Sequence, residues 1–194
     1  GVSSAASDVY KRQGSITGGG NLTKVGSGTF TLSSASSMTG TTTVTAGQFN
    51  LASANLLADT SAVVVNGGVL SFGGNDTIGS VGGSGGTLAI GSNTLTVSQS
   101  GSTSFAGAIT GNGTFTKAGS GILTLTGNAS AYAGATQVQA GTVVANGTLG
   151  GTVAVSLGAI LSGTGTIGGN TSIAGTLNPG GSGVIGTQTF NGNL

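Results

Sequence analysis

The chain has 194 residues, of which 42 are glycine, and it contains neither cysteine nor histidine; four basic and three acidic residues give a net charge of +1. The lack of His and Cys excludes Ser-His-Asp catalysis, cysteine nucleophiles and histidine-ligated zinc. So few basic residues exclude nucleic acid as a partner, because nothing could neutralise a run of phosphates. The many glycines accompany a positive mean hydropathy, which indicates a packed protein and not a disordered one.

Residues 1–13 differ from the rest of the chain. They include Lys11 and Arg12, two of the four basic residues, and Asp8, one of the three acids. They contain neither an initiator Met nor the apolar core of a signal peptide. We predict that residues 1–13 are a non-native or disordered tail and that residues 14–194 form a single domain.

A long internal repeat organises residues 14–194, because residues 16–53 recur at 109–147. Identical residues recur 93 positions later at Ile16, Thr17, Gly18, Gly20, Thr23, Lys24, Gly26, Ser27, Gly28, Thr31 and Leu32. After a one-residue insertion, identical residues recur 94 positions later at Gly40, Val44, Ala46 and Gly47. Such self-similarity is typical of proteins whose units are too small to bury their own apolar faces and therefore stack on each other.

Each copy reads as short strands separated by Gly and Ser. In the first copy, Phe30 and Leu32 alternate with threonines, and Leu123 and Leu125 do the same in the second. This period of two predicts strands with these side chains inward. Val44, Phe49 and Leu51 are predicted to point inward as well.

Similar alternations continue to the C-terminus, at Leu70 and Phe72, Leu88 and Ile90, Leu95 and Val97, Ile160 with Leu161, and Ile173 and Leu177. The best helix candidate is Ala52–Asp59, which we expect to cross a corner as a loop or a single turn. Pro179 is expected at a corner, where no ladder donor is needed. The chain is therefore predicted to be all-β.

Two all-β architectures remain open at this point. Asn-Gly pairs at 66–67, 112–113, 146–147 and 191–192 would suit the hairpins of a β-sandwich. The long repeat and the scarcity of charge favour a parallel β-helix, a β-solenoid with three short strands per rung of roughly 20–25 residues. Residues 14–194 then predict about eight rungs and a rod about 40 Å long.

The carboxylates offer little chemistry. Outside the tail only Asp59 and Asp76 could form the pair that glycoside hydrolysis needs, and they lie in different segments. Residues 73–78 resemble one unit of a calcium-binding β-roll, but the following 82–86 contain no Asp, and a hard cation needs several oxygen ligands. We predict a glycine corner there, and no catalytic, cofactor-binding or metal-binding residues, no cofactor and no enzymatic activity.

Two further features are interpreted as structural. Lys24 and Lys117 could each serve a Ser–Lys dyad, but matching lysines in matching repeats more simply mark an outward position where charge discourages lateral strand pairing. The glycine-rich stretch 79–86 lacks the Lys-Ser/Thr and the helix of a phosphate-binding loop, and we predict that it consists of corners.

The repeat closely resembles the passenger-associated repeat of bacterial autotransporters. Leu22–Leu32 and Phe115–Leu125 match its L-T-K-x-G-x-G-T-L-T-L part, and Gly40–Phe49 and Tyr132–Val143 match its Y-x-G-x-T and V-x-A-G-T-L parts. Met38-Thr39 departs from the usual Tyr-Thr or Tyr-Ser. Residues 158–194 also resemble the passenger segment near the translocator.

The resemblance implies a right-handed parallel β-helix exported through the outer membrane by a C-terminal translocator β-barrel of the same parent chain. It also implies an extracellular or cell-surface location and no catalytic residues in the repeat. We predict a structural stalk or adhesin segment, with a host-cell or glycan surface as a possible partner. The alternatives are a glycan- or ice-binding β-solenoid module and a carbohydrate-active β-helix enzyme.

Overall fold

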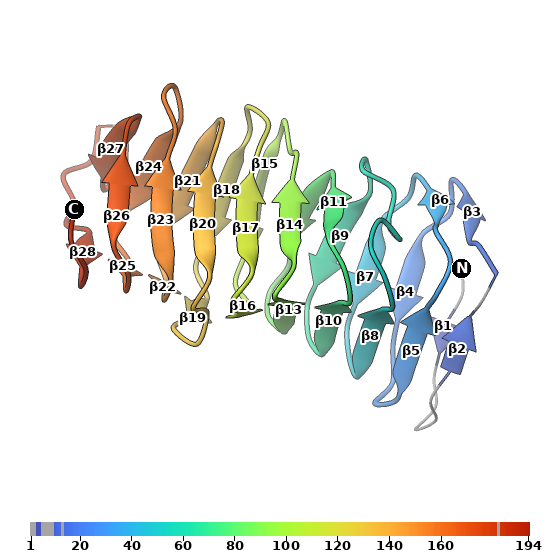
Figure 1. The fold of residues 1–194 in the computed structure, drawn as a ribbon. Coiled ribbons are helices and arrows are strands. Elements are labelled where there is room, and N and C mark those ends of the chain that lie inside the picture. The colour runs from blue at the N-terminus through green and yellow to red at the C-terminus, as the bar shows by residue number, and fades with distance from the viewer. Residues whose placement is uncertain (1–2, 5–9, 13, 182) are drawn as a thin grey trace.

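The chain folds as a β-solenoid of about nine turns in a computed structural model that describes residues 3–4, 10–12, 14–181 and 183–194. The described strands have two to five residues each, and every pairing between them is parallel. Figure 1 shows the strands stacked along a rod from β1 at one end to β28 at the other. The prediction of a parallel solenoid is therefore confirmed, and the Asn-Gly pairs do not form hairpins.

Most rungs supply one strand to each of three faces of the rod, and we number the faces in the order in which the chain reaches them. The first face contains β1 (Ser3–Ser4), β4 (Leu22–Lys24), β7 (Thr42–Val44), β9 (Ala62–Val65), β12 (Ser80–Gly82), β15 (Ser102–Phe105), β18 (Ile122–Leu125), β21 (Thr142–Ala145), β24 (Ile160–Gly163) and β27 (Thr176–Pro179). Between β12 and β15 the ladder narrows to a bridge from Gly83 to Phe105.

The second face contains β2 (Tyr10–Arg12), β5 (Thr29–Leu32), β8 (Gln48–Leu51), β10 (Val69–Phe72), β13 (Thr87–Gly91), β16 (Ala108–Gly111), β19 (Asn128–Ala129), β22 (Thr148–Leu149), β25 (Thr166–Ile167) and β28 (Thr189–Phe190). A bridge from Gly111 to Tyr132 joins its two sheets.

The third face contains β3 (Thr17–Gly18), β6 (Ser37–Met38), β11 (Asp76–Ile78), β14 (Thr94–Val97), β17 (Thr114–Lys117), β20 (Ala135–Val138), β23 (Thr152–Val155) and β26 (Thr171–Ile173). Between β6 and β11 this face is made by the loop Ala52–Asp59 instead of a strand. The backbone N–H of Ser36 donates to Leu56 O at 2.7 Å, and that of Asn55 donates to Asn75 O at 2.9 Å. The expectation of a loop in this segment is confirmed.

The rungs are shorter than the sequence suggested. Residues paired on successive rungs are separated by 16 positions at Leu161 and Leu177 and by 23 at Thr166 and Thr189, with the other pairs between these values. Shorter rungs give more turns, which explains about nine turns where eight were expected. At a strand spacing of about 4.8 Å, nine turns make a rod about 43 Å long.

The core is a narrow column of aliphatic and aromatic side chains that runs inside the three faces. Phe30 and Leu32 in β5 and Leu123 and Leu125 in β18 are buried, as the alternation predicted. Phe30 also meets Phe49 of the next rung edge-on, with ring centroids 5.0 Å apart. At about 25 cal/mol per Å² of buried apolar surface, this column is the main source of stability in a rod with so little charge.

Two other sequence predictions concern the ends of the chain. The prediction that Pro179 lies at a corner is wrong, because Pro179 is the last residue of β27 and pairs with Gly163. Ser3–Ser4 pair with Thr23 and Lys24, and Tyr10–Arg12 pair with Phe30 to Leu32, so these parts of residues 1–13 extend the first and second faces. The remaining residues of this tail lie outside the described ranges, and its native or non-native origin stays a prediction. No helix of the described residues has the length and apolarity needed to cross a membrane.

Candidate functional site

The two lysines of the repeat are buried, so the prediction that they point outward is wrong. Lys24 is 2% exposed at the end of β4, and Lys117 is completely buried at the end of β17. Both occupy inward positions of their strands, in register with inward apolar residues: Lys24 pairs with Val44, and Lys117 with Val97 and Val138.

Each ammonium group is held by three backbone carbonyl groups, an arrangement that we call a lysine cage. Lys24 Nζ donates to Val25 O at 2.8 Å and Gly26 O at 2.8 Å on its own rung, and to Ala46 O at 3.1 Å on the next rung. The contact to Ala46 therefore joins two rungs at the corner between the first and second faces.

The second lysine cage has the same design. Lys117 Nζ donates to Ala118 O at 2.8 Å, Gly119 O at 2.7 Å and, on the next rung, Ala140 O at 3.4 Å. Gly119, at φ 75°, supplies the left-handed turn that follows the lysine, as Gly26 does in the first cage at φ 72°. The Lys-x-Gly spacing that the two copies share thus specifies a corner whose carbonyl groups are bound by the lysine ammonium group.

The lysine cages contain no carboxylate. Burial lowers the pKa of both lysines from the usual value because it disfavours the charged form. The carbonyl oxygens act in the opposite direction, since they accept hydrogen bonds from the ammonium group. Such a lysine has the geometry of a structural clamp and not of a nucleophile beside a serine.

Tyr132 is a third buried polar group of the repeat. Its hydroxyl oxygen accepts a hydrogen bond from the Phe115 N–H at 3.1 Å. The same oxygen lies 2.9 Å from Gly113 O and 2.7 Å from Ala135 O, the two acceptors for its one proton. Burial raises the pKa of Tyr132 to about 12. In the first copy the buried Met38 stands at this position and offers no equivalent hydroxyl.

Asp76 is buried and anchors the loop on the third face. Its Oδ2 accepts from the N–H groups of Leu56 at 3.1 Å and Leu57 at 3.3 Å, whereas Oδ1 has no hydrogen-bond partner. Burial raises the pKa of this carboxyl group, and the negative charge of Asp59 raises it slightly further. Asp76 therefore supports the loop. The predicted glycine corner at 73–78 is confirmed for 73–75, which connect β10 to β11, and is wrong for Asp76–Ile78, which form β11.

The stretch 79–86 is only in part a set of corners. Gly79 forms the corner between the third and first faces, and Gly83–Gly86 connect β12 to β13. Between them lies β12, whose Val81 is buried in the core. The prediction that the whole stretch consists of corners is therefore wrong for Ser80–Gly82.

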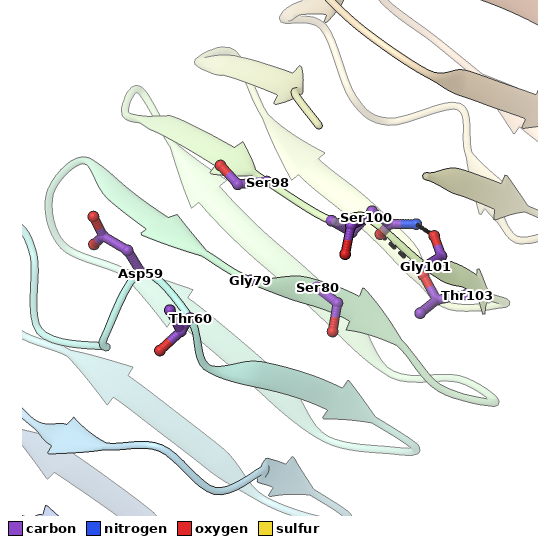
Figure 2. Close-up of a pocket in the computed structure, with 9 residues that line it drawn as sticks. Asp59, Thr60, Gly79, Ser80, Ser98, Ser100, Gly101 and Thr103 are labelled. Atoms are coloured by element: carbon purple, nitrogen blue, oxygen red, sulfur yellow. Dashed lines mark hydrogen bonds between the residues drawn. The ribbon is translucent and has the colours of Figure 1, made fainter. Parts of the chain in front are cut away.

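A hollow of about 460 Å³ lies at the corner between the third and first faces (Figure 2). We call it the corner hollow, and its lining residues are Asp59, Thr60, Gly79, Ser80, Ser98, Gln99, Ser100, Gly101 and Thr103. The cause is a difference in corner length. Gly79 alone connects β11 to β12, whereas four residues, Ser98–Gly101, connect β14 to β15 on the next rung. The short corner is recessed between longer ones.

Among the described residues, no three or more His, Cys, Asp or Glu side chains gather into a group that could hold a metal ion. Of the two candidate carboxylates, Asp59 lines the corner hollow, whereas Asp76 is buried and is not part of its lining. The absence of catalytic and cofactor-binding residues stays a prediction.

Sequence reasoning missed the role of the asparagines at the corners. Several Asn side chains accept a hydrogen bond from a backbone N–H of the following rung, at donor–acceptor distances of 2.8–3.1 Å: Asn21 from Thr41, Asn66 from Ser84, Asn75 from Thr94, Asn146 from Thr164, and Asn170 from Asn193. The partners are 18 to 23 positions apart. Each of these Asn residues lies directly before or directly after a strand, which was the only signal in the sequence.

Comparisons with known proteins agree with this architecture. Residues 22–51 and 115–145 match the family of the passenger-associated-transport repeat, and these segments span β4–β8 and β17–β21. The chain is 38% identical over 136 residues to the adhesin BmaC autotransporter of Brucella suis biovar 1 (strain 1330). The matched region covers 66% of this chain and 4% of that protein. No solved structure matches the chain.

The repeat matches explain why both lysine cages occur where they do, since each match begins in the strand that ends in the caged lysine. The strand pattern, the two repeats and the similarity to an autotransporter all point to the same family. The chain thus contains two copies of the passenger-associated-transport repeat and is similar to an adhesin autotransporter.

Proposed function

We propose that this chain is a stalk segment of a surface-displayed autotransporter passenger and performs no catalysis itself. The observation that carries the proposal is the stacking of parallel strands on three faces along the whole described rod, around one continuous apolar column. Such a rod keeps whatever it carries at a fixed distance from the membrane. The relative's designation as an adhesin autotransporter supports a structural or adhesive passenger.

The partner that this proposal requires is a translocator β-barrel of the same parent chain, which exports the passenger to the cell surface. Each rung is completed by hydrogen bonds to its neighbour, so folding can propagate rung by rung from one end. Folding outside the cell would then favour export, because a folded rung does not slide back. The lysine cages and the asparagine contacts each join consecutive rungs and support this order of assembly.

The alternative of an ice-binding plane finds no support in the arrangement of the threonines. Thr29 and Thr31 lie on the second face, Thr94 and Thr96 on the third, and Thr124 and Thr126 at the first. Threonines that point in three directions do not form the regular plane that ice binding needs. A glycan-binding role would need a site of another kind.

The proposal is tested by removing one rung in register. Deletion of 142–159 brings Ile160 to the place of Thr142, its ladder partner, and leaves both lysine cages complete. We expect the shortened chain, placed between an epitope tag and a translocator barrel, to be displayed on cells as well as the parent, with the rod shorter by about 4.8 Å.

The matched control removes 142–150, about half a rung, so that all following strands meet the wrong face. It should lose display and become protease-sensitive. Equal display of both deletions would show that export does not depend on rung stacking. Loss of display with the in-register deletion, despite a folded purified chain, would contradict the stalk function.

A further inference from the structure

The corner hollow is a concave polar surface on the described rod for which the stalk function gives no use. Three of its features bear on a ligand: how rigidly it is held, which groups face it, and how large it is. The wall Ser98–Thr103 is fixed from within by Gln99, whose side chain is 2% exposed. Gln99 Nε2 donates to Gly101 O at 3.2 Å and to Ile122 O, on the next rung, at 2.6 Å.

Gln99 also contacts Thr103, at the other end of that wall. Its Oε1 lies 3.0 Å from Thr103 Oγ1, which lies 2.6 Å from Val81 O, so the one hydroxyl proton of Thr103 is shared between two acceptors. In Figure 2 a dashed line that ends at Thr103, beside Ser100 and Gly101, marks its contact with Gln99. A buried amide thus holds the longer corner in a fixed shape.

The other wall, Asp59 and Thr60, is also anchored from the interior. Asp76 holds the preceding Leu56 and Leu57, and the Ser61 N–H donates to Ala58 O at 2.8 Å to close the turn. The floor is Gly79, where an added Cβ would clash with the Thr60 carbonyl oxygen. Both walls and the floor are therefore preorganised, which lowers the entropy lost when a ligand binds.

The residues that line the corner hollow carry polar side chains. Asp59, Thr60, Ser98 and Ser100 are exposed, and Ser80 is half-buried. An anion is disfavoured by Asp59, and a divalent cation would find one carboxylate where several oxygen ligands are needed. No aromatic or long aliphatic side chain lines the hollow, which disfavours lipids and apolar peptides.

Vicinal hydroxyls of a sugar fit this set, because they can donate to the carboxylate and exchange hydrogen bonds with the Ser and Thr hydroxyls. A volume of about 460 Å³ lies within the usual range for small-ligand sites. We propose that the corner hollow is a binding site for a neutral mono- or disaccharide unit, with Asp59 as the principal acceptor. This proposal rests on the proposed passenger function only because the rod must be displayed on the cell surface for the site to meet glycans.

The test uses NMR amide spectra of the whole chain, titrated with methyl glycosides of glucose, galactose, mannose, fucose and N-acetylglucosamine up to about 10 mM, a range suited to weak affinity. We expect at least one glycoside to shift the amide signals of Thr60, Ser80 and 98–103 in a saturable way. Asp59→Asn keeps the shape and removes the charge, and it should weaken binding about tenfold or more.

Ser100→Trp should fill the hollow and abolish binding, whereas Ser120→Trp, at the same corner one rung further, should leave it unchanged. Three outcomes overturn the proposal: no saturable shift with a well-folded chain, shifts that survive both Asp59→Asn and Ser100→Trp, or binding of putrescine without any glycoside. None of them affects the rung-deletion test, so a failed saccharide site and a failed stalk function give different results.

Discussion

Replacement of Lys117 by Met tests whether the lysine cage stabilises the rod or only tolerates a buried charge. The thioether side chain has a similar length and fills the same space, but it cannot donate to carbonyl groups. Ala118 O, Gly119 O and Ala140 O would each lose a hydrogen bond from a charged donor. The change also removes the unfavourable burial of an ammonium group, which acts in the opposite direction.

The magnitude follows from the geometry. The two contacts at 2.8 and 2.7 Å are strong, and the third at 3.4 Å contributes little. Hydrogen bonds to charged groups contribute about 1.5–3 kcal/mol each, and after the desolvation gain is subtracted we expect a loss of about 2–4 kcal/mol. For a chain of this size that corresponds to a decrease in Tm of about 4–16 °C.

Thermal unfolding followed by far-ultraviolet circular dichroism, together with guanidinium unfolding, measures this loss. Gln137→Met, at an exposed position of the neighbouring β20, is the matched control and should change Tm by less than about 2 °C. Lys24→Met should behave like Lys117→Met, and the double variant should show the sum, because the two lysine cages share no partner. An unchanged or higher Tm for Lys117→Met would refute the reasoning and show that desolvation outweighs the carbonyl contacts.

Two further predictions concern the second repeat. Tyr132→Phe should lower the unfolding free energy by about 1–3 kcal/mol, because the Phe115 N–H and the carbonyl groups of Gly113 and Ala135 each lose their hydrogen bond to the hydroxyl. The pKa of Tyr132 is raised from 10.0 to about 12, so above pH 10 the unfolded chain loses the proton first, and the stability of the parent should fall between pH 10 and 12. Guanidinium unfolding at several pH values should show a smaller fall in stability for Tyr132→Phe than for the parent. Equal falls in the two proteins would contradict this prediction. Gly158 has φ 82° and open space around it, so Gly158→Ala should lower the unfolding free energy by about 1–2 kcal/mol through backbone strain alone. Gly141 has φ 67° and lies against the carbonyl oxygens of Gly121 and Gly119, so Gly141→Ala should lower the unfolding free energy by clearly more. Similar decreases in Tm for the two variants would mean that backbone strain alone decides.

The strand faces could be predicted from the sequence because alternation has a direct physical cause. Phe30 and Leu32, or Leu123 and Leu125, must share one side of an extended strand, and their apolarity says which side is covered. The position of the two lysines was predicted wrongly because their charge was given more weight than this alternation. Lys24 alternates with Leu22, and Lys117 with Phe115, which indicated an inward position. The carbonyl acceptors that make burial possible belong to backbone and leave no trace in residue type.

Features that depend on the following rung were the least predictable. The number of turns differed from expectation because single-residue corners such as Gly79 shorten a rung, and corner length has no compositional signature. The corner hollow arises from the difference between that corner and Ser98–Gly101 one rung later. The contact between Asn146 and Thr164 likewise joins residues that are 18 positions apart in sequence. Such relations are set by stacking, which a local pattern does not contain.

The two repeat copies begin on different faces of the rod. Leu22–Lys24 belong to the first face and the matching Phe115–Lys117 to the third, so the sequence period is not a whole number of turns. The motif is therefore a building block for a corner and not for one face, and at least two of the three corners accept it. The outward residues of the two copies consequently lie on different faces of the rod, so that one repeated motif presents its exposed side chains in two directions.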